Sequence, residues 1–124
     1  MELLCAMYPV EDLEAVAELY RGLGFKDVAR PDEDTLLLSA GESGPVEIML
    51  ERHPLEMKAG PGPVFRVDDV TAFHADKTEL TWLLPPTEIA TGHYAVFADP
   101  ARNPVRIIDF TRDSGRYARL FRRS

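Results

Sequence analysis

The chain has 124 residues, of which 45% are hydrophobic, and it carries a formal net charge of −7. This length suits a single domain, and the apolar content is typical of a soluble globular protein rather than a disordered or fibrous chain. No apolar run approaches the roughly 18 residues needed to cross a membrane, and the acidic excess disfavours nucleic acid as a partner.

The amino-terminal residues and the cysteine content indicate a cytoplasmic protein. Glu2 and no basic residue precede the first apolar run, which is unlike a secretory signal. Cys5 is the only cysteine, so no internal disulfide can form. We therefore expect a cytoplasmic location.

The first part of the chain predicts a strand, a helix and three further strands. Residues 2–9 alternate between two largely apolar faces, and Glu11 and Asp12 then provide an N-cap for a helix. Apolar residues recur at helical spacing after this cap, at Leu13, Val16, Ala17 and Tyr20. Strands are predicted over 25–30, 35–39 and 45–52, separated by turn-forming residues.

The second part predicts the same order of elements after a break rich in proline and glycine. Residues 54–61 indicate a linker between two modules, 1–53 and 62–110. A strand over 64–67 and a helix over 69–77 follow. The remaining predicted strands cover residues 80–84, 93–98 and 104–110.

Two pairs of segments repeat at nearly the same offset. The run VEDLEAV from Val10 returns as VDDVTAF from Val67, 57 residues later, and PVEIML from Pro45 returns as PVRIID from Pro104, 59 residues later. We interpret this as a duplicated module. The alternative is that acids before helices and valine-rich strands are common by themselves.

Longer stretches carry a family resemblance. The segments VEDLEAVAELYRGLGF, VFRVDDVTAF and PPTEIATGHYAVFADPARNPVRIIDF resemble the vicinal oxygen chelate superfamily, which includes glyoxalase I, extradiol dioxygenases and bleomycin resistance proteins. DPARNPVRII is similar to the superfamily's DPxGNxxEL run, and the PTEI segment to the bleomycin resistance branch. Over nearly residues 2–110, the resemblance implies an α+β fold. Two tandem βαβββ modules would form curved mixed sheets around a shared cavity, usually in a homodimer.

The resemblance also implies where a metal would bind. Metal-dependent members carry ligands at four positions, which fall here on Cys5, Glu47, Gly62 and Arg106. Glycine offers no side chain, and arginine does not lose its proton. We therefore expect no metal and no other cofactor.

The same positions and their neighbours make up the predicted ligand-binding set. Its members are Cys5, Glu47, Met49, Trp82, His93, Tyr94 and Arg106. Glu47 and Met49 share a strand face, and His93 and Tyr94 point to opposite faces, so at most one of them looks into the cavity. Trp82 either lines a pocket or fills the core. Arg106 either pairs with Glu47 as a structural substitute for the metal or holds an anionic or carbonyl-bearing ligand.

The last residues differ in charge from the rest of the chain. Residues 1–110 hold nine lysines and arginines against 20 acids, whereas residues 111–124 hold five arginines against Asp113. Tyr117, Leu120 and Phe121 predict an amphipathic tail helix. We expect the tail to dock on its own domain or on a dimer mate rather than on an anionic membrane or nucleic acid.

The leading hypothesis is a metal-free protein that binds a small organic molecule, with no committed catalytic residue. One alternative is a divergent lyase or isomerase in which Glu47 acts as base and Arg106 as the electrophilic partner. Another is a structural or regulatory dimer with a filled cavity. The expected partners are a small organic ligand and a second copy of the chain, with no nucleic acid and no membrane.

Overall fold

The computed structural model describes residues 1–42, 44–113 and 115–122. It divides into two compact units. Unit 1 comprises residues 1–4 and 62–119, and unit 2 comprises residues 5–61 and 120–122. The units thus follow the two predicted modules, except that the first four residues cluster with the second module and the last with the first. No helix of the described residues is long and apolar enough to cross a bilayer.

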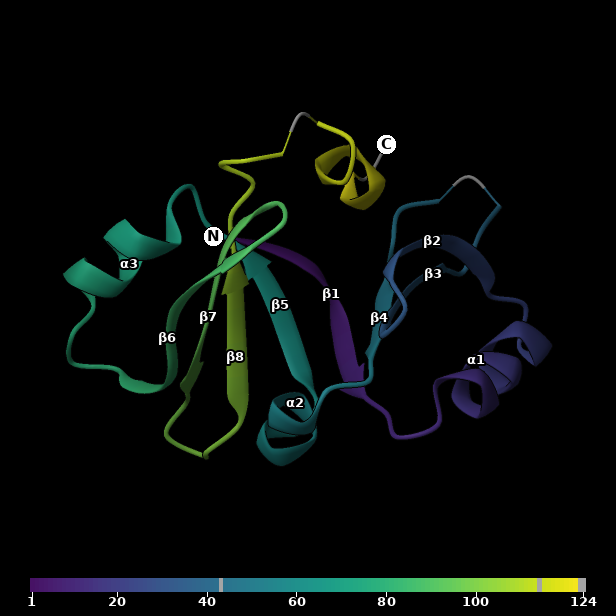
Figure 1. Cartoon of the computed structure of the whole chain (residues 1–124), viewed down its shortest axis with the longest axis horizontal. Helices are drawn as coiled ribbons and strands as arrows, with labels where there is room; N and C mark the ends of the chain where they lie inside the picture. Colours follow the sequence, from purple (N-terminus) through teal and green to yellow (C-terminus); the bar gives the residue numbers. More distant parts are fainter. Residues whose placement is uncertain (43, 114, 123–124) are drawn as a thin grey trace. The chain divides into compact units, whose positions relative to one another are not determined.

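Unit 2 holds a mixed sheet covered by one helix (Figure 1). Strand β1 pairs in parallel with β4, and β4, β3 and β2 follow one another in antiparallel pairs. In chain order the elements are β1 (Glu2–Pro9), α1 (Leu13–Gly22), β2 (Lys26–Asp32), β3 (Thr35–Ser39), β4 (Ile48–Glu51) and α2 (Pro54–Ala59), with the residues of β1 from Cys5 onward belonging to this unit.

Helix α1 forms where its cap and its apolar spacing predict it. The side chain of Asp12 accepts a hydrogen bond from the Ala15 amide at 3.1 Å and so satisfies one of the free N–H groups of the first turn. Leu13 and Ala17 are buried on the side facing the sheet. They pack in one apolar cluster with Val10, Leu36, Leu38 and Leu50.

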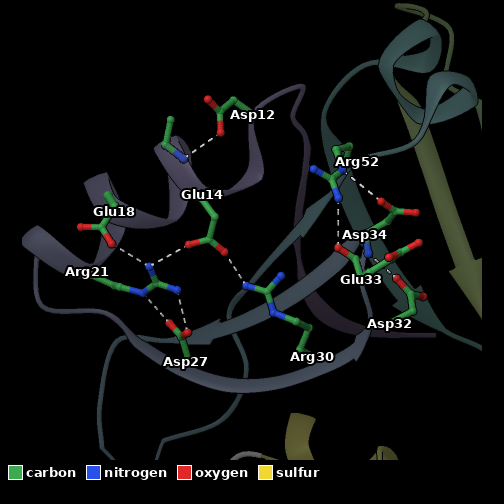
Figure 2. Close-up of polar contacts among 11 residues, drawn as sticks. Asp12, Glu14, Glu18, Arg21, Asp27, Arg30, Asp32, Glu33, Asp34 and Arg52 are labelled. Carbon is green, nitrogen blue, oxygen red and sulfur yellow. Dashed lines mark hydrogen bonds and ion pairs between the residues drawn. The ribbon is translucent and has the colours of Figure 1, made fainter.

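An ion-pair network joins the exposed side of α1 to β2 (Figure 2). The guanidinium of Arg21 forms a forked contact with Asp27, at 2.9 Å through Nε and 2.8 Å through Nη2. Glu14 accepts from Arg30 at 2.7 Å. Hydrogen bonds from Arg30 and Arg21 lower the pKa of Glu14, and the hydrogen bond from Arg21 lowers that of Asp27. Because these groups are exposed, the network contributes little to stability.

Unit 1 repeats the strand order of unit 2. Strand β5 pairs in parallel with β8, and β8, β7 and β6 follow in antiparallel pairs, which matches the order β1, β4, β3, β2. This equivalence confirms the predicted pair of βαβββ modules. The elements are β5 (Gly62–Arg66), α3 (Val70–Asp76), β6 (Thr81–Ile89), β7 (Gly92–Ala98) and β8 (Pro104–Ile108).

Several predicted bounds differ from the structure, among them those of β5 and β8, and three differences have a clear physical reason. The linker contains helix α2, which His53 begins by accepting the Leu55 amide on Nδ1 at 3.2 Å, with Pro54 at the start where its missing N–H costs nothing. Strand β6 continues through Pro85 and Pro86, because register shifts on both sides of Leu84 absorb them in a strand with one partner. Strand β4 begins at Ile48 rather than at residue 45.

The tail forms a short 3₁₀ helix, η1 (Ala118–Phe121), rather than a longer amphipathic helix, and its residues from Leu120 onward belong to unit 2. Phe121 is buried, and the Val46 amide donates to the Leu120 carbonyl at 2.8 Å. The end of the tail thus packs within unit 2 of its own chain, which is one of the two positions expected for it.

Asp109 is a buried polar junction in unit 1. Its fully buried carboxylate accepts hydrogen bonds from the Val70 amide at 2.8 Å, the His93 amide at 2.9 Å and the Thr111 hydroxyl at 2.9 Å. Burial opposes ionisation of this carboxyl, but the hydrogen bonds from Val70, Thr111 and His93 outweigh it, so the pKa of Asp109 lies below its ordinary value. One side chain thereby ties the start of β7, the first turn of α3 and the end of β8 together.

This junction requires glycine at position 92. A Cβ added to Gly92 would collide with the Asp109 carboxylate and lie 2.9 Å from the Thr111 hydroxyl oxygen. We expect Gly92→Ala to lower the free energy of unfolding by at least about 2 kcal/mol in urea denaturation. Gly22→Ala is the matched control, because a Cβ there meets nothing within 4 Å. Equal effects of the two substitutions would contradict the proposed role of the junction.

Candidate functional site

Gly62 and Arg106 lie side by side in unit 1. Strand β5 runs parallel to β8, with Val64 opposite Arg106. A Cβ added to Gly62 would collide with the Pro104 carbonyl oxygen and lie 3.3 Å from Nη1 of Arg106. The guanidinium therefore lies against the place where a side chain at position 62 would begin. Any side chain there would have to displace the backbone of β8 or the arginine.

Arg106 is fully buried and points away from α3. Its neighbour Ile107 belongs to the apolar cluster under α3, so strand alternation places Arg106 on the other face of the sheet. Its register partners Val64 and Val96 are also buried. Because a guanidinium keeps its proton in proteins, a fixed positive charge lies inside this unit.

The equivalent positions in unit 2 are Cys5 and Glu47. Burial raises the pKa of the Cys5 thiol to about 12, so the sulfur stays protonated and is neither a ready nucleophile nor a ready metal ligand. Oε1 of Glu47 accepts the Ala40 amide at 3.0 Å. Met7 and Met49 are register partners, and they lie with Cys5 and Glu47 on the face opposite α1.

These four positions do not fit a divalent metal. Glycine and a buried arginine occupy two of them, and a protonated thiol occupies a third. Within the described ranges, no three or more histidine, cysteine, aspartate or glutamate side chains are grouped so that they could hold an ion.

Tyr94 and His93 lie on opposite faces of β7, as alternation predicts. Tyr94 pairs with Ile108, and Val96 with Arg106, so Tyr94 shares the face of the buried arginine. His93 instead belongs to the α3 side, where its Nδ1 lies 3.5 Å from Oδ2 of Asp109. Of this pair, only Tyr94 faces the same way as Arg106.

Trp82 packs against the apolar cluster under α3, which is the core position of the two that the sequence left open. Its indole ring packs edge-to-face against Phe97 at a centroid distance of 5.3 Å and contacts Phe73 of α3. The indole Nε1 donates to the Lys77 carbonyl at 2.9 Å. Trp82 therefore lies on the α3 side of the sheet. There its ring adds aromatic surface to the contact between the short helix α3 and the sheet.

Glu51 is a site candidate that the sequence analysis missed. It pairs with Thr35 across the β3–β4 ladder, accepts the Thr35 hydroxyl at 2.5 Å, and shares the face of Met49. Burial, then repulsion from Asp32, Glu56 and Asp34, raises the pKa of Glu51 to about 7, although the Thr35 hydrogen bond acts in the opposite direction. Strand alternation from Glu47 predicts the face on which Glu51 lies. The burial of Glu51 depends on residues from other elements, so the sequence alone does not show it.

This shift predicts how the stability of unit 2 depends on pH. The pKa of Glu51 is raised above its ordinary value of about 4.5, so the folded state binds the proton more tightly. The stabilisation is complete below about pH 4.5 and is lost as the pH rises through about 7. We expect Glu51→Gln to reduce the fall in Tm across this window, and the exposed Glu11→Gln to leave it unchanged. A full wild-type slope in Glu51→Gln would show that another group titrates.

Comparison with known proteins gives matches among solved structures only. No family model and no curated protein sequence match the chain. A protein described as an NAD-dependent benzaldehyde dehydrogenase from Legionella pneumophila superposes with a TM-score of 0.68 at 21% identity, over 86% of this chain and 98% of that one. A glyoxalase/bleomycin resistance protein/dioxygenase superfamily member from Vibrio splendidus 12B01 gives 0.58 at 17% identity, over 85% and 96%.

A Mn(II)-bound glyoxalase from Novosphingobium aromaticivorans gives a TM-score of 0.57 at 16% identity. The match covers 87% of this chain but only 38% of the glyoxalase. The TM-scores show a shared fold, whereas sequence identities this low leave the activity open. The chain therefore has the fold of the vicinal oxygen chelate superfamily, as the resemblance of its sequence implied.

Proposed function

We propose that the chain is a metal-free protein that binds a small organic molecule, of the glyoxalase/bleomycin resistance type. The observation that carries this proposal is the packing of Arg106 against Gly62 at two positions where metal-dependent relatives are expected to hold an ion. A guanidinium supplies the positive charge there, and the missing side chain gives it room.

The chemistry of Arg106 suggests the class of ligand. A guanidinium offers several N–H donors in one plane, which match the two oxygens of a carboxylate or the oxygen of a carbonyl group. The phenol of Tyr94 lies on the same face of unit 1. We therefore propose a ligand that bears a carboxylate or a carbonyl group, bound on the side of the sheet that α3 does not cover. A homodimer, implied by the resemblance, is part of this proposal.

One observation favours an enzyme as the second candidate. Glu51 has a pKa of about 7 and shares a strand face with Glu47 and Met49. A general base works best when its pKa lies near the working pH. In this alternative either Glu47 or Glu51 would act as the general base of a lyase or isomerase, taking a proton from a carbon next to a carbonyl group.

Metal analysis and a ligand screen test the proposal together. Elemental analysis after incubation with manganese, nickel and zinc salts should find no stoichiometric metal, because the four positions lack a ligand set. Small carboxylates and 2-oxo acids should raise Tm as their concentration increases. A stoichiometric metal, or a screen in which no compound raises Tm, would overturn the proposal.

Substitution of Arg106 identifies the anchor. Arg106→Lys keeps the charge and loses the planar fork, so we expect ligand affinity to fall about tenfold while the protein remains folded. Arg112→Gln is the matched control, because Arg112 is an exposed arginine of unit 1 paired with Glu88 at 2.6 Å. Unchanged affinity in Arg106→Lys would remove Arg106 from the site. Turnover that Glu51→Gln or Glu47→Gln abolishes without loss of binding would favour the enzyme.

A further inference from the structure

A cleft lies entirely within unit 1, at the end of β5. It has a volume of about 450 Å³, within the range of roughly 300–1,000 Å³ that small-molecule sites occupy. The residues that line it are Met1, Glu2, Arg66, Val67, Asp68 and Phe73. None of them belongs to the ligand-binding set predicted from the sequence, although Arg66 shares a strand face with Arg106 through its register partner Ile108.

The cleft brings one cationic side chain and two carboxylates together without pairing them. Arg66, Glu2 and Asp68 all line it, yet across the described ranges no hydrogen bond or ion pair involves any of their side chains. Two of these groups are only two residues apart in sequence, where pairing would be easy. Charges of both signs therefore remain available to a ligand.

Arg66 is held in place by an aromatic ring rather than by an acid. Its guanidinium carbon lies 5.0 Å from the centre of the Phe110 ring. Such a contact occupies one face of the guanidinium and leaves the N–H groups at its edge free to bind a carboxylate in a forked manner. The arginine is thus oriented before a ligand arrives, which lowers the entropy lost on binding.

The rest of the lining is apolar. Val67 and Phe73 contribute aliphatic and aromatic surface beside the charged groups. A complementary ligand would carry a carboxylate for the arginine, a separate ammonium group for the two acids and an apolar side chain for the apolar surface. We propose that this cleft binds a free amino acid with an apolar side chain, with its carboxylate on Arg66 and its ammonium group between Glu2 and Asp68.

Titration with L-leucine tests this proposal. Two-dimensional NMR should show saturable shifts of the Arg66, Val67 and Asp68 amides, and calorimetry should give the affinity. L-Leucinamide lacks the carboxylate and N-acetyl-L-leucine lacks the ammonium group, so we expect each to bind at least about tenfold more weakly than L-leucine. Absence of shifts at millimolar L-leucine, or saturable shifts confined to other residues, would overturn the proposal.

Two substitutions and a matched control assign the roles. Arg66→Gln and Asp68→Asn should each weaken L-leucine binding by about tenfold or more, whereas Arg112→Gln, elsewhere in unit 1, should not change it. Equal affinity of L-leucine and L-leucinamide, or of the wild type and Arg66→Gln, would exclude the carboxylate contact. Because none of these measurements involves Arg106, failure here leaves the proposed function of the Arg106 face untouched, and the reverse also holds.

Discussion

The close approach of Arg106 to Gly62 is the constraint on which the site depends. The arginine lies fully buried beside a residue without a side chain, and a Cβ at position 62 would collide with the neighbouring strand. The two residues therefore have to be considered as one unit of structure. A side chain at position 62 would require the backbone of β8 to shift and would press on the Arg106 guanidinium, and a smaller residue at 106 would leave a cavity beside β5.

The two modules share a topology but handle polar groups differently. Unit 1 buries an arginine and an aspartate, and Asp109 is held by amides from two other elements. By the internal offset, the position of Asp109 corresponds to Leu50 in unit 2, which simply joins the apolar cluster under α1. Unit 2 instead places an acid, Glu51, at the end of a strand, where burial raises the pKa of its carboxyl. The two modules share a strand order because strand order depends on the apolar pattern. They differ at single polar positions.

Apolar periodicity and the internal repeat were sufficient to predict the order of elements along the chain, helix α1 and the strand face of Arg106, whereas the arrangement of the two modules was implied by the family resemblance. The errors arose where tertiary context decides. Helix α2 is six residues long and depends on a histidine cap, so it is too short to show the apolar periodicity by which a helix is predicted. Trp82 was assigned no definite face because register shifts along β6 break the simple alternation. Glu51 was missed because its raised pKa depends first on burial, and then on three acids that come from other segments of unit 2.

A guanidinium and a metal ion supply different chemistry at the same place, which is why this substitution bears on function. An arginine presents directional N–H donors and a permanent charge, and it has no open coordination position in which water could be activated. It can still polarise a carbonyl oxygen or pair with a carboxylate. In the proposed function, recognition of such a group is therefore independent of metal supply. Its strength depends on how well the buried side chains around Arg106 hold the guanidinium plane, since a misdirected fork loses one of its two hydrogen bonds.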